Sequence, residues 1–158
     1  MKPDREAVLV GPGEGRSFMG GLKCRIPSTS TGGAYCAFEV VTLPGQGVPP
    51  HVHSREDELY YILEGQLEIQ CGQRRFQVEA GAMAVLPRGI PHAFRNTADT
   101  LSRALTVFIP GGFDEFVAEL RQLPPEDAAD EKKRDVIREK YGIRLVRPGA
   151  AEPGRGVG

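Results

Sequence analysis

The hydrophobic pattern changes once along the chain, near residue 110. Between about residues 8 and 110, short runs of β-branched and aromatic residues are broken by Gly, Pro, Asn and Asp at intervals of roughly ten residues. This spacing predicts many short strands, arranged as a β-sandwich or barrel. The expected strands are 22–26, 35–43, 58–63, 66–71, 74–78, 82–86, 92–96 and 103–109.

After the sequence Pro-Gly-Gly at 110–112, apolar residues recur every three or four positions, which predicts an amphipathic helix that ends at Pro124 and Pro125. The apolar positions are Phe113, Phe116, Val117, Leu120 and Leu123. A second, charged helix is expected at about 126–140 and a short edge strand at 143–146. We detect no internal repeat, so we expect one domain over residues 1–147, with a barrel at about 8–110, a helical segment at about 112–141, and a flexible tail at 148–158.

Composition narrows the functional classes. The chain has 158 residues, of which 40% are hydrophobic and 26% charged, as in an ordinary globular domain. Its 20 Lys and Arg residues nearly balance 21 Asp and Glu residues, and no basic block is present, so we expect no nucleic-acid partner. Because no long apolar stretch is present and charges interrupt the first ten residues, we expect a cytoplasmic protein without a membrane partner.

The three cysteines, Cys24, Cys36 and Cys71, are odd in number and lack the CxxC spacing. This pattern argues against a disulfide framework or a zinc ribbon. We expect them to be small apolar residues, with Cys71 at a hairpin turn.

All three histidines of the chain lie in two short segments. His51 and His53 are two positions apart, so on an extended strand both rings leave the same face and can converge on one metal ion. A polar run then allows a turn, after which Glu58 begins an alternating apolar strand and can present a carboxylate oxygen to the same point. His92 follows a strand and a Pro/Gly turn in the second segment.

These two segments resemble the paired signature motifs of the cupin superfamily. The motif positions are Gly45, His51, His53, Glu58 and Gly65 in the first segment and Gly81, Pro87, Gly89, His92 and Asn96 in the second. More loosely, the segments TGGAYCAFEV, EDELYYILEG, PRGIPHAF and PGGFDEF are similar to single-domain proteins related to quercetin dioxygenase. One departure is Ala82, where many relatives have Asp; that position is usually in a turn.

The resemblance implies an all-β fold, a jelly-roll barrel of two antiparallel sheets with C-terminal helices. It also implies that His51, His53, Glu58 and His92 bind one divalent transition metal per chain. Three imidazoles and a carboxylate suit Fe, Mn, Ni, Cu or Zn, so the metal stays open. Four protein ligands leave room for water, dioxygen or a chelating substrate.

Strand parity predicts the substrate pocket. If Glu58 points inward, Tyr60 and Ile62 do so too, and counting from His92 adds Phe94. From the facing sheet we expect Phe38 and Val40. This lining is apolar and aromatic, which favours a planar aromatic compound or another hydrophobic enol over a sugar or oxalate, for which inward Arg or Lys would be expected.

The same parity places three large side chains, Leu59, Tyr61 and Leu63, on the outer face. They need a cover, which either the C-terminal helices or a second subunit supplies. We favour a homodimer, because small cupins usually pair.

The leading functional hypothesis is a metal-dependent dioxygenase, an oxidoreductase whose small-molecule substrate is an enolisable or phenolic compound. The alternatives are a redox-neutral metal-dependent isomerase, cyclase or lyase, and a non-catalytic small-molecule-binding cupin. In the first case, all three histidines are used as metal ligands, so Glu58 is the expected general base, a role that the resemblance also implies. Tyr60 is a weaker candidate because a phenol has a pKa near 10.

Overall fold

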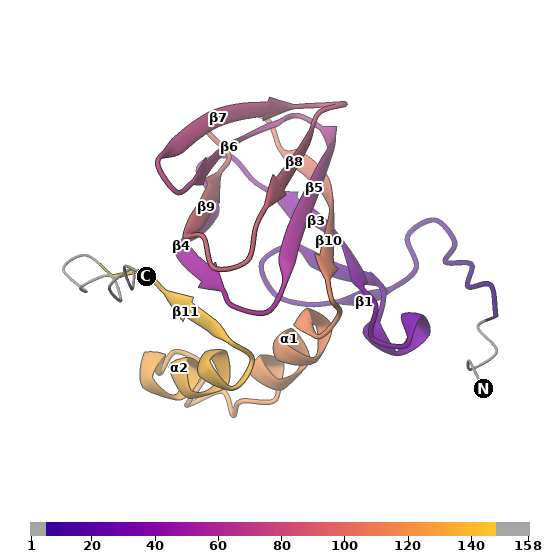
Figure 1. Ribbon diagram of the computed structural model, residues 1–158, viewed down its shortest axis with the longest axis vertical. Helices are drawn as coiled ribbons and strands as arrows, with labels where there is room; N and C mark the ends of the chain where they lie inside the picture. Colours follow the sequence, from indigo (N-terminus) through magenta and orange to yellow (C-terminus); the bar gives the residue numbers. More distant parts are fainter. Residues whose placement is uncertain (1–5, 148–158) are drawn as a thin grey trace, which may run out of the picture.

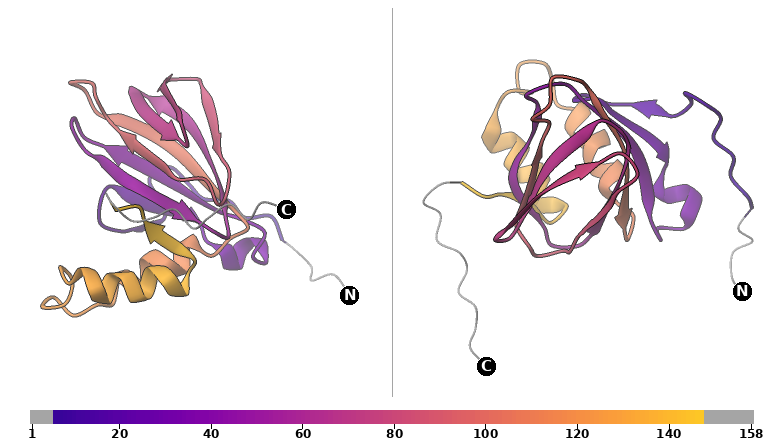
Figure 2. Two further views of the ribbon diagram at one scale, coloured as in Figure 1. Left: turned by 60° about the vertical axis from the view of Figure 1, so that its left-hand side comes forward. Right: turned by 90° about the horizontal axis from the view of Figure 1, so that it is seen from above.

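The computed structural model describes residues 6–147, which form a barrel of two antiparallel sheets that face each other (Figures 1 and 2). Sheet A has the strand order β1-β2-β3-β10-β5-β8 and sheet B the order β11-β4-β9-β6-β7. The strands are β1 (Arg16–Ser17), β2 (Leu22–Ile26), β3 (Cys36–Thr42), β4 (Gly47–His53), β5 (Asp57–Glu64), β6 (Gln66–Cys71), β7 (Arg74–Glu79), β8 (Met83–Leu86), β9 (His92–Arg95), β10 (Ser102–Ile109) and β11 (Ile143–Leu145). The predicted all-β jelly-roll class is confirmed.

Two α-helices lie together at one end of the barrel (Figure 1), and a 3₁₀ turn, η1 (Ser28–Thr31), follows β2. The first helix, α1 (Phe113–Arg121), begins where the periodicity predicts. The second, α2 (Glu131–Lys140), begins about five residues later than expected. Its start is set by Asp130, whose carboxylate accepts hydrogen bonds from the backbone of Lys132 and Lys133, as an N-cap does.

The buried residues form two clusters, one at each end of the barrel. At the end remote from the helices, the cluster contains Tyr60, Ile62, Leu67, Ile69, Val78, Ala84, Leu86, Phe94 and Ala104. At the helical end, it contains Cys24, Cys36, Phe38, Val40, Phe108, Phe116, Val117, Ile137 and Ile143. Both helices and β11 therefore contribute to the core that closes the barrel.

The predicted parity of β5 is confirmed by its burial. Glu58, Tyr60 and Ile62 are buried, whereas Leu63 is 41% exposed. On the outer face, Met83 and Val85 of the neighbouring strand β8 are 61% and 60% exposed, because the helices pack against the core at the end of the barrel. The sequence analysis expected either the C-terminal helices or a second subunit to cover this face. The helices do not cover it.

The cysteines agree with their predicted role. Cys24 and Cys36 are buried in the helical-end cluster, and Cys71 ends β6 directly before the Gly72 turn. Among the described residues, no helix has the length and apolarity needed to cross a bilayer. The expected tail, 148–158, lies outside the described residues.

Candidate metal centre

The two sheets bring the four predicted ligands to one point. His51 and His53 lie on β4 and His92 on β9, all in sheet B, whereas Glu58 comes from β5 of sheet A. All four side chains are buried, and their potential ligand atoms lie within 4.8 Å of one another. This group, His51, His53, Glu58 and His92, is called the metal group below.

Backbone carbonyls orient two of the three imidazoles. Nδ1 of His51 lies 2.9 Å from the carbonyl oxygen of Pro49, and Nδ1 of His92 lies 3.0 Å from that of Ile90. The Pro49 contact occurs where the register of β4 against β9 shifts between Val48 and His51. In each ring the Nδ1–H donates to a carbonyl, which leaves Nε2 as the nitrogen that can bind a metal ion.

His53 is held by a side chain that the sequence analysis did not select. Nδ1 of His53 lies 3.4 Å from Oε2 of Glu56, and Glu56 is only 4% exposed although it lies in the polar loop between β4 and β5. The next residue, Asp57, accepts hydrogen bonds from the backbone and guanidinium of Arg88 and thereby ties this loop to the turn before β9. A carboxylate that accepts from the second nitrogen of a metal-binding histidine is a recurrent feature of metal sites.

The donor set fits a cation. Nε2 of His92 lies 3.0 Å from Oε2 of Glu58, while its Nδ1 is committed to Ile90. A neutral imidazole cannot donate from both nitrogens, so Nε2 and the carboxylate oxygen face each other as two acceptors unless a proton or a metal ion lies between them. The negative charges of two buried carboxyl groups, Glu56 and Glu58, would also be neutralised by one divalent ion.

The protonation states suit metal binding at neutral pH. Burial, reinforced by the neighbouring His92 and His53, lowers the pKa of His51 from 6.5 to about 4, so the ring is neutral. Burial acts to raise the pKa of Glu58, but the hydrogen bond with His92 and the electrostatic interaction with the neighbouring histidine rings outweigh it and lower that pKa. Burial, followed by the Glu58 charge, holds the pKa of Tyr60 well above 10, so its phenol keeps its proton.

A cavity of about 860 Å³ opens from the metal group and receives His51, His53 and Glu58 in its wall. Of the five predicted pocket residues, Val40, Tyr60 and Phe94 line it. Phe38 and Ile62 are fully buried and belong to the two core clusters instead. Phe38 packs edge to face against Phe108 and Phe113, whose rings stand between the core and the cavity.

Sequence reasoning missed much of the cavity wall because the C-terminal helices supply it. Apolar side chains come from α1 and β11, and charged ones from both helices. The added residues are Phe113, Phe116, Val117, Leu120, Arg121, Glu131, Arg134, Arg138, Ile143 and Leu145. The expectation of a wall without arginine is therefore corrected: three arginines line the helical side of the cavity. Thr106 of β10 is a further unpredicted polar residue in the wall.

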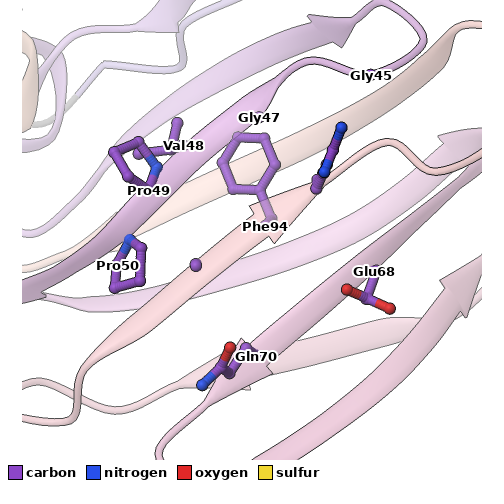
Figure 3. Close-up of a pocket in the computed structure, with 10 residues that line it drawn as sticks. Gly45, Gly47, Val48, Pro49, Pro50, Glu68, Gln70 and Phe94 are labelled. Atoms are coloured by element: carbon purple, nitrogen blue, oxygen red, sulfur yellow. The ribbon is translucent and has the colours of Figure 1, made fainter. Parts of the chain in front are cut away.

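A smaller hollow of about 320 Å³ lies over β4, β9 and β6 of sheet B. Figure 3 shows Glu68 and Gln70 on one side of it and Val48, Pro49 and Pro50 on the other. No member of the metal group lines this hollow, so the chemistry is assigned to the larger cavity.

Comparison with known proteins agrees with the fold and the site. Residues 38–108, which contain the whole metal group, match the family model described as "Cupin domain". The chain is 27% identical over 106 residues to polyketide synthase CurC of Streptomyces cyaneus, which covers 67% of this chain and 68% of that protein. It is 30% identical over 95 residues to quercetin 2,3-dioxygenase of Bacillus subtilis, covering 58% of this chain and 28% of that protein.

Solved structures show the same architecture. TT1209 from Thermus thermophilus superposes with a TM-score of 0.51 at 29% identity, covering 60% of this chain and 89% of that one. KdgF from a Halomonas species superposes with a TM-score of 0.59 at 18% identity, covering 70% of this chain and 99% of that one, which supports the fold alone. The chain belongs to the cupin superfamily. Its matches to the quercetin dioxygenase and to a germin-like protein of Arabidopsis thaliana span only 28% and 35% of those proteins.

Proposed function

We propose that the protein is a metal-dependent dioxygenase that acts on a small enolisable or phenolic compound. The observation that supports this proposal is the position of the metal group, whose four ligand atoms lie within 4.8 Å of one another beside a largely apolar cavity of about 860 Å³. The likeness to quercetin 2,3-dioxygenase supports the reaction class.

A bound transition metal would supply Lewis acidity and, for iron, copper, manganese or nickel, redox chemistry. The chain itself must accept the proton of the enol or phenol. The Nδ1–H of each histidine is directed to an oxygen of the protein, and each Nε2 faces the metal group. Glu58 lines the cavity and has a second carboxylate oxygen, so we assign proton acceptance to Glu58.

Aromatic side chains would exclude water and orient the substrate. Phe108 and Phe113 stack at 3.9 Å between ring centroids, and each lies 5.6 Å from the His53 ring. On another part of the wall, Tyr60 and Phe94 meet edge to face at 5.6 Å. Because Tyr60 keeps its proton, it is a poor base; its hydroxyl interacts with Glu58 and would have to turn from it to donate a hydrogen bond to a substrate oxygen.

The arginines refine the substrate class. Arg138 is nearly buried and is paired with both Glu131 and Asp135, whereas Arg134 shares the same Glu131 at 3.7 Å. Among the described lining residues of the two helices, three are arginines and one, Glu131, carries a carboxylate. We propose that the substrate combines an apolar body with an acidic group on the helical side.

A second candidate is a redox-neutral isomerase, cyclase or lyase, in which the metal ion acts only as a Lewis acid. The likeness to a protein named as a polyketide synthase, over two thirds of this chain, supports a reaction other than oxygenation. A non-catalytic small-molecule-binding cupin is the third candidate.

Two measurements distinguish these candidates. Elemental analysis is made on protein purified without added metal, and oxygen uptake is then followed with quercetin and with 2,4-pentanedione. Iron, copper, manganese or nickel together with oxygen uptake would support the dioxygenase. Zinc without oxygen uptake would support the redox-neutral enzyme, and a protein that stays metal-free after incubation with these ions would contradict both. The His92→Ala variant is the control for background oxidation.

We also propose that a second copy of the chain covers the outer face of β5 and β8. Strand pairing sets Leu59 opposite Val85 and Tyr61 opposite Met83, which makes a continuous apolar patch on one sheet. An exposed apolar patch of this kind can pair with itself about a two-fold axis. Sedimentation should show a dimer that Val85→Glu dissociates and that Leu43→Glu, at an exposed apolar residue on another part of the surface, does not. A monomeric parent would contradict the proposal.

A further inference from the structure

The hydroxyl of Thr106 is a buried polar group that makes no hydrogen bond of good geometry with the described residues. Thr106 lies on β10, is 1% exposed, and lines the cavity beside the metal group. A valine would occupy nearly the same volume without leaving a polar atom unpaired. The Tyr60 hydroxyl lies near enough to interact with this group, but no contact of hydrogen-bond geometry is formed, so a well-aligned partner would come from the cavity.

The position of Thr106 connects it with the proposed chemistry. In the register of β10 against β5, Thr106 stands opposite Tyr60, and Phe108 stands opposite Glu58. Glu58, Tyr60 and Thr106 thus occupy adjacent inward positions of sheet A, and all three line the cavity. A molecule that reaches the metal group passes within the reach of two neighbouring hydroxyl groups.

The same strand offers a comparison. Ser102 is also 1% exposed and also has a hydroxyl without a hydrogen-bond partner in the described chain. However, Ser102 does not line the cavity. An unpaired hydroxyl is thus tolerated twice on β10, but only Thr106 presents it where a ligand can bind.

We propose that Thr106 and Tyr60 form a hydrogen-bonding subsite that holds one oxygen atom of the substrate while a second oxygen atom reaches the metal group. This subsite rests on the proposed metal-dependent function and specifies its substrate further. The substrate then has at least two oxygen atoms, one for the metal group and one for the two hydroxyls. A compound with one isolated oxygen would leave the Thr106 hydroxyl unpaired.

The test combines a protein change with a ligand change. Thr106→Val removes the hydroxyl at constant shape, and Thr106→Ser keeps it. The probes are 3-hydroxyflavone, which has adjacent hydroxyl and carbonyl oxygens, and flavone, which lacks the hydroxyl. Their affinities are measured by calorimetry on protein of known metal content. Thr106→Val should weaken 3-hydroxyflavone binding about tenfold, the loss of one hydrogen bond, and leave flavone binding within twofold. Thr106→Ser should restore most of the loss.

Melting temperatures separate the effect of the hydroxyl on folding from its effect on ligand binding. Because the unpaired hydroxyl disfavours folding, Thr106→Val and Ser102→Ala should both raise the melting temperature of the metal-free protein, by about 2–4 °C for each. Only Thr106→Val should change probe binding.

Equal effects of Thr106→Val on both probes, no effect on either, or a parent that holds metal but binds neither probe would overturn the subsite. A parent that fails to bind metal would instead overturn the proposed function, and the metal content distinguishes the two failures.

Discussion

Removal of the Glu56 carboxylate should weaken metal binding without weakening the fold. Glu56 is 4% exposed, and its Oε2 lies 3.4 Å from Nδ1 of His53. In the Glu56→Ala variant, the His53 ring loses the acceptor that fixes its orientation and raises the basicity of Nε2. Loss of such partners typically reduces metal affinity by about 10–100-fold.

The distance between His53 and Glu56 narrows the expected loss of metal affinity. A separation of 3.4 Å is long for an N–H···O hydrogen bond, so the contact should contribute at the lower end for a charged acceptor, about 1.5–2 kcal/mol. This corresponds to a loss of about 10–30-fold in affinity for Glu56→Ala. In Glu56→Gln the amide oxygen can still accept from the ring but the charge is lost, so about half of that free energy, or a three- to sixfold loss, is expected.

Competition with a chromophoric chelator measures the affinity for Zn²⁺ and Ni²⁺, with unfolding of metal-free and metal-loaded protein followed in parallel. Glu64→Gln, which removes an exposed charge at the far end of β5, is the matched control and should bind metal like the parent. The metal-free Glu56→Gln protein should be at least as stable as the parent, because a buried carboxylate has been removed. The reasoning fails if Glu56→Ala binds metal as tightly as the parent, or if the metal-free variants lose stability in step with their affinity.

Three further outcomes follow from the site. Glu58→Gln should keep much of its metal through three imidazoles yet lose at least roughly a hundredfold in turnover per bound metal, whereas Tyr60→Phe should lose far less; the opposite order would remove Glu58 as the base. Phe94→Ala should weaken 3-hydroxyflavone binding at unchanged metal content, because its ring lines the cavity outside the metal group, and unchanged binding would contradict that role. In the metal-free protein, the lowered pKa of His51 means that the unfolded chain takes up a proton more readily, so stability should be complete above pH 6.5 and decline as the pH falls towards 4. Urea unfolding should show a decrease on the order of 2–3 kcal/mol over this range, and His51→Asn should flatten the profile; an equal slope in this variant would assign the effect to other groups.

Most of the strands and the metal group were predictable because their signals are local. Alternation along β5 assigns Glu58 and Tyr60 to the inner face, and the spacing of His51 and His53 does the same on β4. The structure places all these side chains where the two-residue period requires.

The missed features depend on contacts between distant segments. Glu56 lies in a polar run, so its sequence context gives no sign that it is buried. Its burial depends on the position of the loop, which the hydrogen bonds between Arg88 and Asp57 hold in place. Phe38 has the predicted direction, but Phe113, which follows it by 75 residues, covers it from the cavity. The arginines of α2 were unexpected in the wall because periodicity indicates which side of a helix is polar but gives no information on what that side faces.

The division of the cavity wall between two parts of the chain has a consequence for how proteins of this type can diverge. The metal group lies entirely within the segment that matches the cupin family, residues 38–108, whereas the arginines and two of the aromatic side chains around the cavity come after residue 108. Substitutions in the helical segment can thus change what is bound while the metal ligands stay unaltered. The two parts are not freely exchangeable, because Phe116, Ile137 and Ile143 share one core with Phe38 and Phe108. A graft of a foreign helical segment onto this barrel must bring compatible core residues with it, and selectivity is more readily redesigned at Arg134 than by exchange of whole helices.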